Sequence, residues 1–140
     1  MMLANNKNLT FTYAEMKYFQ MWYSRLDPAR KEATKNMIKS GQLEIVQGGW
    51  TSSDESCANY EDLIMQMYIG HQFLKKEFGV TPRVGWMLDA FGHSATNAAL
   101  FSDFGFDAMY FSRLDDDSRP RKVVDSPDFF PTTFLWRPNS

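Results

Sequence analysis

The sequence predicts an α/β domain with a parallel sheet and helices outside it. Short apolar runs typical of buried strands alternate with longer segments whose apolar residues recur at helical spacing. The order is strand, helix, helix, strand, helix, strand, helix, strand. Alternation of this kind implies right-handed crossovers, so the strands are expected to run parallel and to end at one rim. With 140 residues, the chain is long enough for one domain with a core.

Turn and capping residues separate these elements. Residues 9–13 alternate apolar side chains with threonine, as a short strand does. The pair Asp27-Pro28 is a helix start, because Asp accepts from first-turn amides and Pro fits the first helical position. Three helices are expected to end at Gly41, Gly79 and Gly105. The predicted elements are strands at 9–13, 43–47, 83–88 and 106–111, helices at 15–26, 28–40, 60–78 and 95–104, and one further strand near 133–137.

The composition is that of a globular protein, with 44% hydrophobic and 23% charged residues. The net charge is −2 and no basic run occurs, which argues against nucleic acid as a main partner. No segment approaches the length of a membrane span, which argues against a membrane partner, and no signal peptide is visible. The single cysteine, Cys57, excludes an internal disulfide and has no basic neighbour that would activate it.

Polar side chains gather where three of the predicted strands end. Ligands and catalytic groups collect at the carboxyl ends of parallel strands, so we expect these side chains at one rim. A carboxylate beside an arginine stays ionised there, and it can serve as a nucleophile, a metal ligand or a substrate anchor. The residues are Gly48, Gly49 and Trp50 with Asp54 after the second strand, Asp89 with His93 after the third, and Arg113 with Asp115 after the fourth.

The turn that begins at Asp89 is the centre of the candidate site. Asp89 and His93 have the i, i+4 spacing of two metal ligands on a helix, but a capping Ser94 places both before the helix. We therefore expect His93 to support the turn by hydrogen bonds, while a metal role for Asp89 stays open. Phe91, on the turn, is a better platform for a sugar ring than Trp86, which is expected in the core.

Other chemistry-bearing residues have plainer interpretations. His71 lies on the apolar stripe of the helix at 60–78, together with Tyr60 and Tyr68, and is expected to be a hydrogen-bonded core histidine. Asp54 and Glu55 could be catalytic. A loop carboxylate before a helix more often stabilises the amino terminus of that helix, and we expect this role for the pair.

Taken together, the motifs resemble one known family. The matching segments include Gly-Gln-Leu-Glu-Ile-Val-Gln-Gly-Gly-Trp at 41–50 and Asp-Ala-Phe-Gly-His-Ser at 89–94. Between and after them, the order and spacing agree at 54–55, 66–67, 70–74, 78–79, 82–86, 100–101, 105–107 and 113–115. The chain resembles the catalytic domain of the glycoside hydrolase family 38 α-mannosidases, especially the lysosomal class. Residues 1–140 are expected to be a partial N-terminal catalytic domain of that family.

The resemblance implies an α/β barrel-like fold, incomplete here, and a zinc-dependent enzyme. Such enzymes remove terminal α-D-mannose from glycans with retention, which needs one carboxyl group as nucleophile and one as acid and then base. By this match Asp89 is the nucleophile and also a zinc ligand. Phe91 lines the sugar site, and Arg113 lies near the nucleophile and the substrate. A lysosomal or other secretory-pathway location is implied as well.

The same resemblance places several family segments outside this chain. A His-x-Asp strand with two zinc ligands is expected before Met1, and the acid/base aspartate and the last zinc histidine are expected beyond Ser140. Zinc sites use three or four protein ligands, and this chain offers one, Asp89. We therefore expect a fragment that carries the nucleophile and does not turn over substrate alone. Ala90 replaces the family's proline, which loosens the turn but removes no chemistry.

Two other functions stay open at this point. A noncatalytic remnant could serve as a carbohydrate-binding or structural module. A metal-dependent sugar deacetylase is a further alternative, because that chemistry also places a metal at the rim of a related fold.

Overall fold

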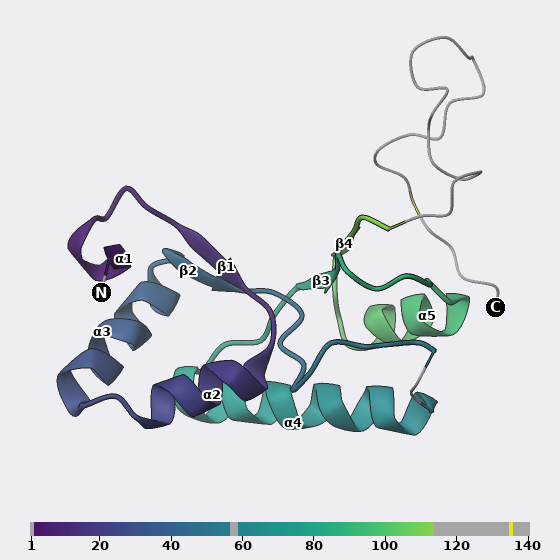
Figure 1. The fold of residues 1–140 in the computed structure, drawn as a ribbon, viewed down its shortest axis with the longest axis horizontal. Coiled ribbons are helices and arrows are strands. Elements are labelled where there is room, and N and C mark those ends of the chain that lie inside the picture. The colour runs from purple at the N-terminus through teal and green to yellow at the C-terminus, as the bar shows by residue number, and fades with distance from the viewer. Residues whose placement is uncertain (1, 57–58, 114–134, 136–140) are drawn as a thin grey trace, which may run out of the picture.

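The structure is a computed structural model that describes residues 2–56, 59–113 and 135. Within these residues the predicted order of strands and helices is confirmed, and a short helix is added at the amino terminus (Figure 1). The structure does not describe Cys57 or Asp115. The strand predicted near 133–137 also lies outside the described residues, except for Leu135. The elements are α1 Met2–Asn5, β1 Phe11–Tyr13, α2 Met16–Ser24, α3 Pro28–Lys39, β2 Leu43–Ile45, α4 Tyr60–Phe78, β3 Val84–Met87, α5 Ala95–Asp103 and β4 Ala108–Phe111.

The predicted start of α3 and the predicted end of α4 are confirmed in detail. Asp27 is the N-cap of α3, and its carboxylate accepts a hydrogen bond of 2.8 Å from the backbone amide of Arg30. Gly79 ends α4 in the left-handed conformation, with φ of 69°, and its amide donates to the carbonyl of Lys75. Only glycine takes this conformation at little cost, which explains why α4 ends where the sequence indicated.

The four strands form two parallel pairs, β1 with β2 and β3 with β4. Gln47 connects the pairs. Its backbone amide donates to the carbonyl of Val84 at 2.6 Å, and its side-chain oxygen accepts from the amide of Trp86 at 3.1 Å. The side-chain oxygen of Gln47 thus accepts the hydrogen bond that a backbone carbonyl of a neighbouring strand would accept from β3. The two pairs are therefore joined through Gln47, and the strands run parallel within each pair.

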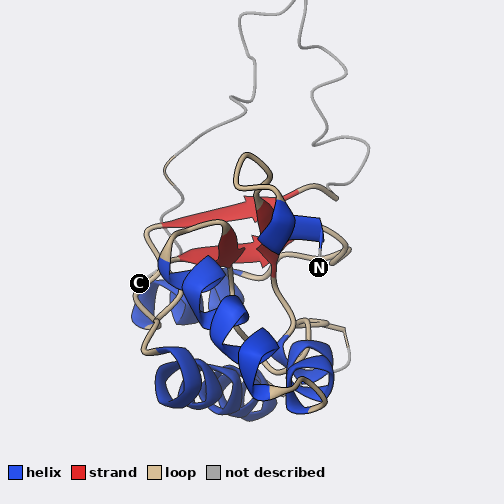
Figure 2. Cartoon of the chain, turned by 90° about the vertical axis from the view of Figure 1, so that its left-hand side faces the viewer, coloured by secondary structure: helices blue, strands red, loops and turns tan. Residues whose placement is uncertain are grey.

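The longer helices lie on one side of the strands (Figure 2). In β2 and β3 every second side chain faces the helices and is buried, as are Leu43, Ile45 and Met87. Trp86 points the other way, is only half-buried, and contacts the ring of Tyr110 at a centroid distance of 6.0 Å. The expectation that Trp86 belongs to the core is wrong, because no helix among the described residues covers that face.

Helix α4 packs directly against the backbone that follows β2. A Cβ atom at Gly70 would lie 1.9 Å from the carbonyl oxygen of Gly48, so only glycine fits there. The amide of Trp50 donates to the carbonyl of Gln66 in α4 at 2.9 Å. The backbone at residues 48–50 therefore lies in direct contact with this helix.

The buried face of α4 is narrower than the sequence predicted. It consists of Leu63, Met67, Gly70 and Leu74, whereas Tyr60 and Tyr68 are exposed. Tyr68 lies one residue beyond Met67, which turns it about 100° away from the packed face. Tyr60 begins the helix, where little of the fold reaches it.

Replacing Gly70 by alanine should destabilise the fold by about 3 kcal/mol, a typical cost of overpacking. Alanine favours a helix by up to about 1 kcal/mol over glycine. The new methyl group would nevertheless overlap the backbone oxygen of Gly48, and no rotamer change relieves that overlap. Urea unfolding measures the difference.

The matched control is Gly92→Ala, where the added Cβ would meet no atom within 4 Å. Equal unfolding midpoints for the Gly70→Ala and Gly92→Ala variants would contradict the close packing of α4 on residues 48–50.

Candidate functional site

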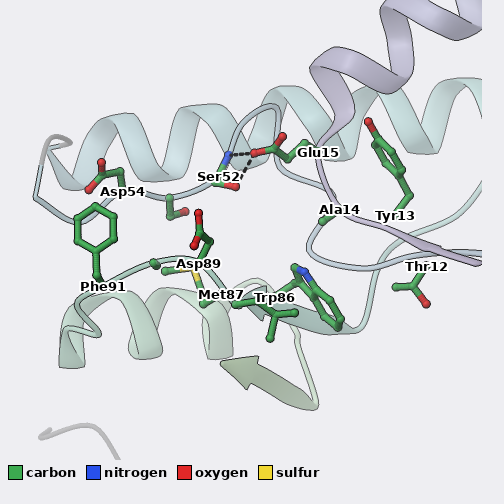
Figure 3. Close-up of a pocket in the computed structure, with 13 residues that line it drawn as sticks. Thr12, Tyr13, Ala14, Glu15, Ser52, Asp54, Trp86, Met87, Asp89 and Phe91 are labelled. Carbon is green, nitrogen blue, oxygen red and sulfur yellow. Dashed lines mark hydrogen bonds between the residues drawn. The ribbon is translucent and has the colours of Figure 1, made fainter. Parts of the chain in front are cut away.

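A pocket of about 520 Å³ opens at the carboxyl ends of β1 and β3 (Figure 3). Three segments meet there: the end of β1 with the residues after it, the loop after β2, and the turn after β3. The lining residues are Thr12, Tyr13, Ala14 and Glu15, then Ser52, Ser53 and Asp54, then Trp86, Met87, Leu88, Asp89, Ala90 and Phe91. The pocket combines carboxylates with aromatic surface, which is the chemistry expected for a carbohydrate site.

Asp89 is the carboxylate at the end of β3, and Arg113 follows the end of β4. Both contacts between them use one carboxylate oxygen: Oδ1 accepts from Nε of Arg113 at 2.9 Å and from Nη2 at 2.6 Å. In the described part of the chain, Oδ2 makes no hydrogen bond. Figure 3 shows the carboxylate of Asp89 in the gap between the turn and the loop that carries Ser52. One oxygen is thus oriented by the arginine and the other is left for a ligand.

This ion pair lies in solvent. The side chain of Asp89 is 88% exposed and that of Arg113 is 55% exposed. Water screens charges at such exposure, so the pair adds at most about 1 kcal/mol to stability. Its contribution is to the orientation of the carboxylate and not to folding.

Phe91 stands at the edge of the pocket with 72% of its surface exposed. Figure 3 shows its ring beside Asp54, across the pocket from Trp86. An exposed ring at a pocket edge can stack on the apolar face of a sugar. The half-buried Trp86, which the sequence assigned to the core, lines the same pocket and adds a second aromatic surface.

The loop after β2 is fixed by side chains from two other elements. Oε1 of Glu15 accepts from the amide of Ser52 at 3.2 Å and from its hydroxyl at 2.5 Å. From α4, the side chain of Gln66 binds the amide of Thr51 and the hydroxyl of Ser53. Sequence reasoning missed Glu15, although a carboxylate two residues after a strand was a signal that could have found it.

The phenol of Tyr13 is held in its neutral form beside this loop. Burial raises the pKa of Tyr13, and the negative charge of Glu15 raises it further. Because the raised pKa lies above the ordinary value of 10.0, Tyr13 stays a hydrogen-bond donor at neutral pH.

Both histidines make the structural hydrogen bonds that the sequence predicted, although His71 is half-buried and not in the core. Nε2 of His93 donates to the carbonyl of Arg113 at 2.7 Å, and the ring packs against Phe111. Nε2 of His71 donates to the carbonyl of Gln47 at 2.8 Å. The first bond ties the Asp89 turn to the end of β4, and the second ties α4 to the junction between the strand pairs.

The expectation that Asp54 and Glu55 stabilise the start of α4 is wrong for Glu55, which binds another helix. Asp54 closes a local turn by accepting from the amide and the hydroxyl of Ser56. Glu55 accepts from the backbone amide of Ser94, the N-cap of α5, and not from α4. Helix α4 carries its own acidic first turn, Glu61 and Asp62. The sequence could not show that Glu55 reaches a helix 39 residues further along the chain.

The resemblance implies a zinc ion at this site. Among the described residues, no group of three or more His, Cys, Asp or Glu side chains is placed to hold a metal ion. A zinc site requires three or four protein ligands. Asp89, which lines the pocket, fits one of them, but the described residues alone do not fit a complete site.

Comparison with known proteins identifies the class to which this site belongs. Residues 1–140 match the N-terminal domain of the glycosyl hydrolases family 38. The chain belongs to this family, which confirms the resemblance seen in the sequence.

Individual relatives agree with this assignment. An alpha-mannosidase of Arabidopsis thaliana is 44% identical over 86% of the chain, and the lysosomal alpha-mannosidase of Dictyostelium discoideum is 43% identical over 96%. Alpha-mannosidase 2 of Rattus norvegicus is 41% identical over 98% of the chain. The chain spans 12–13% of the length of these relatives. In the part that the structure describes, no helix is long and apolar enough to cross a membrane.

Replacing Arg113 by glutamine should change the free energy of unfolding by less than about 1 kcal/mol, because the ion pair with Asp89 is exposed. Chemical unfolding measures the change, with the exposed Arg25→Gln as the matched control. A loss of several kcal/mol for Arg113→Gln alone would show that the pair holds the fold together.

Proposed function

We propose that the chain is part of the catalytic domain of a retaining α-mannosidase that removes terminal α-D-mannose from glycans. The observation that carries the proposal is the placement of Asp89. It stands at the carboxyl end of β3, in the pocket, with one oxygen bonded to Arg113. Family membership supports the reaction class, since the named relatives are alpha-mannosidases.

Asp89 acts as the nucleophile in this proposal. One oxygen of its carboxylate forms a bond to the anomeric carbon of mannose while the bond to the leaving glycosidic oxygen breaks. That oxygen takes a proton from a carboxylic acid, and water later cleaves the glycosyl ester with the same group as base. Arg113 binds Oδ1 of Asp89 through two of its nitrogen atoms and so orients the carboxylate that attacks the sugar. Phe91 stacks on the sugar ring.

Zinc is part of the same proposal. The ion would bind sugar hydroxyls and orient the ring when bound, with Asp89 as one of its ligands. The remaining ligands and the acid/base aspartate come from parts of the protein outside residues 1–140. We accordingly propose that the chain works within a polypeptide of about the relatives' length and is inactive alone.

Three features of the described residues support the proposed barrel-like fold. The strands are parallel, the helices lie on one side of them, and the outer edges of β1 and β4 have no strand partner. A sheet closed by further strands would place Trp86 and Tyr110 inside a barrel. A lysosomal or other secretory-pathway location is proposed from the Dictyostelium relative, which is named lysosomal.

Hydrolysis of an aryl α-mannoside tests the proposed function. In the polypeptide that contains this chain, Asp89→Asn should lower kcat by about a thousandfold or more, because the nucleophile is lost. Azide should restore turnover of an activated substrate and give the mannosyl azide of inverted configuration. The 140-residue chain alone should release no aglycone.

Asp103→Asn, an exposed carboxylate on α5, is the matched control and should retain full activity. Full activity of Asp89→Asn would overturn the role of Asp89, and hydrolysis by the isolated chain would overturn its dependence on other segments.

A carbohydrate-binding or structural module without catalysis is the second candidate. The exposed Phe91 ring and the incomplete metal site favour it. In that case the chain would bind mannose without zinc, and Asp89→Ala would leave this binding unchanged.

A further inference from the structure

The turn that carries Asp89 has little support of its own. In the described part of the chain, residues 89–93 make no backbone-to-backbone hydrogen bond. Asp89 and Phe91 are exposed, and a Cβ at Gly92 would meet nothing within 4 Å. The position of a nucleophile on such a turn must be set by contacts from elsewhere in the fold.

One of these contacts is a helix cap supplied from a distant loop. In a capping box, the N-cap side chain binds the N3 amide, and the N3 side chain returns to the N-cap amide. Ser94 of α5 makes the first bond, since its hydroxyl accepts from the amide of Asn97 at 3.0 Å. The side chain of Asn97 is directed to the sulfur of Met87 and does not make the second. Oε2 of Glu55, 39 residues away, binds the Ser94 amide in its place.

Glu55 is itself held firmly enough to position its partner. The residue before it, Asp54, closes a turn by accepting from the amide and hydroxyl of Ser56 at 3.1 and 2.7 Å. One residue further back, Ser53 is bound by Gln66 of α4. The base of the Glu55 side chain is therefore fixed to the main helix of the fold.

The geometry excludes Glu55 from direct chemistry. Oε2 is occupied by the Ser94 amide, and Oε1 is enclosed, without a hydrogen bond to the described residues. Glu55 does not line the pocket, although its neighbour Asp54 does. A group placed in this way can act only through the turn that it holds.

We propose that Glu55 is a positioning residue that fixes the Asp89 turn by capping α5 at Ser94. Its carboxylate links the loop after β2 to the turn after β3, and so sets the distance and direction of Asp89 and Phe91 relative to the rest of the pocket. The kinetic part of this inference rests on the proposed mannosidase activity. The structural part does not.

Hydrogen exchange of the Ser94 amide tests the structural part in the folded protein. The amide should be protected in the natural protein and in Glu55→Gln, whose amide oxygen can accept the same bond. In Glu55→Ala its exchange should accelerate by about tenfold or more, the factor for a loss of about 1.4 kcal/mol of local protection. Amides within α4 should be unchanged, which would show that the fold is intact. Equal Ser94 exchange in the natural protein and in Glu55→Ala would overturn the cap.

Kinetics with an aryl α-mannoside test the consequence in the polypeptide that contains the chain. Glu55→Ala should lower kcat by about 10- to 100-fold with a small change in KM, since small misplacement of a reacting group has costs of this size. Glu55→Gln should restore most of kcat, and the exposed Glu32→Ala on α3 is the matched control.

The outcomes separate this inference from the proposed function. Equal losses in Glu55→Gln and Glu55→Ala would make Glu55 a catalytic acid or base and overturn a positioning role. Accelerated Ser94 exchange without any mannosidase activity in the natural protein would retain the cap and contradict the proposed function.

Discussion

The arrangement of the strands depends on one residue, Gln47. Its amide, its carbonyl and its side-chain oxygen are bonded to Val84, His71 and Trp86 respectively. To make these bonds it adopts a positive φ of 53°, which is uncommon for any residue other than glycine and costs on the order of 1–3 kcal/mol. The three hydrogen bonds, made at a site that is 1% exposed, offset that cost. These bonds join the β3–β4 pair to the end of β2, and Asp89 follows β3 at the rim.

Hydrogen bonds between different loops stabilise the rim at the carboxyl ends of the strands. Glu15 holds Ser52, Glu55 holds Ser94, and Arg113 meets both Asp89 and His93. Each bond joins the ends of different strands or the loops that follow them. Helix α4 supports this arrangement from behind, because Gly70 lets it lie against the backbone after β2. The exposed carboxylate of Asp89 is in this way carried by a rigid frame, although its own turn makes few contacts.

Sequence patterns were sufficient for local structure and insufficient for contacts across the chain. The Asp27-Pro28 start and the Gly79 end follow from capping chemistry that acts within a few residues, so they were predictable. Gln47 looks like an ordinary strand residue, and nothing local shows its left-handed backbone. The Glu15–Ser52 and Glu55–Ser94 bonds join residues 37 and 39 positions apart, beyond the reach of any periodicity. Asp89 and Arg113 were singled out because they follow predicted strands, and Phe91 because it lies on the turn; the family's motif added their roles. The structure brings Asp89 and Phe91 to one pocket, with Arg113 bonded to Asp89.

The central claim is that Asp89 attacks the sugar from this frame, and covalent trapping tests it most directly. A fluorinated α-mannosyl fluoride reacts quickly with the nucleophile of a retaining enzyme and leaves a glycosyl ester that hydrolyses slowly. Peptide mass spectrometry of the trapped polypeptide should find the fluorosugar on Asp89, and unlabelled mannose analogues should compete with it. A label on Asp54, Glu15 or another carboxylate, or turnover of the reagent with no trapped ester, would contradict the account.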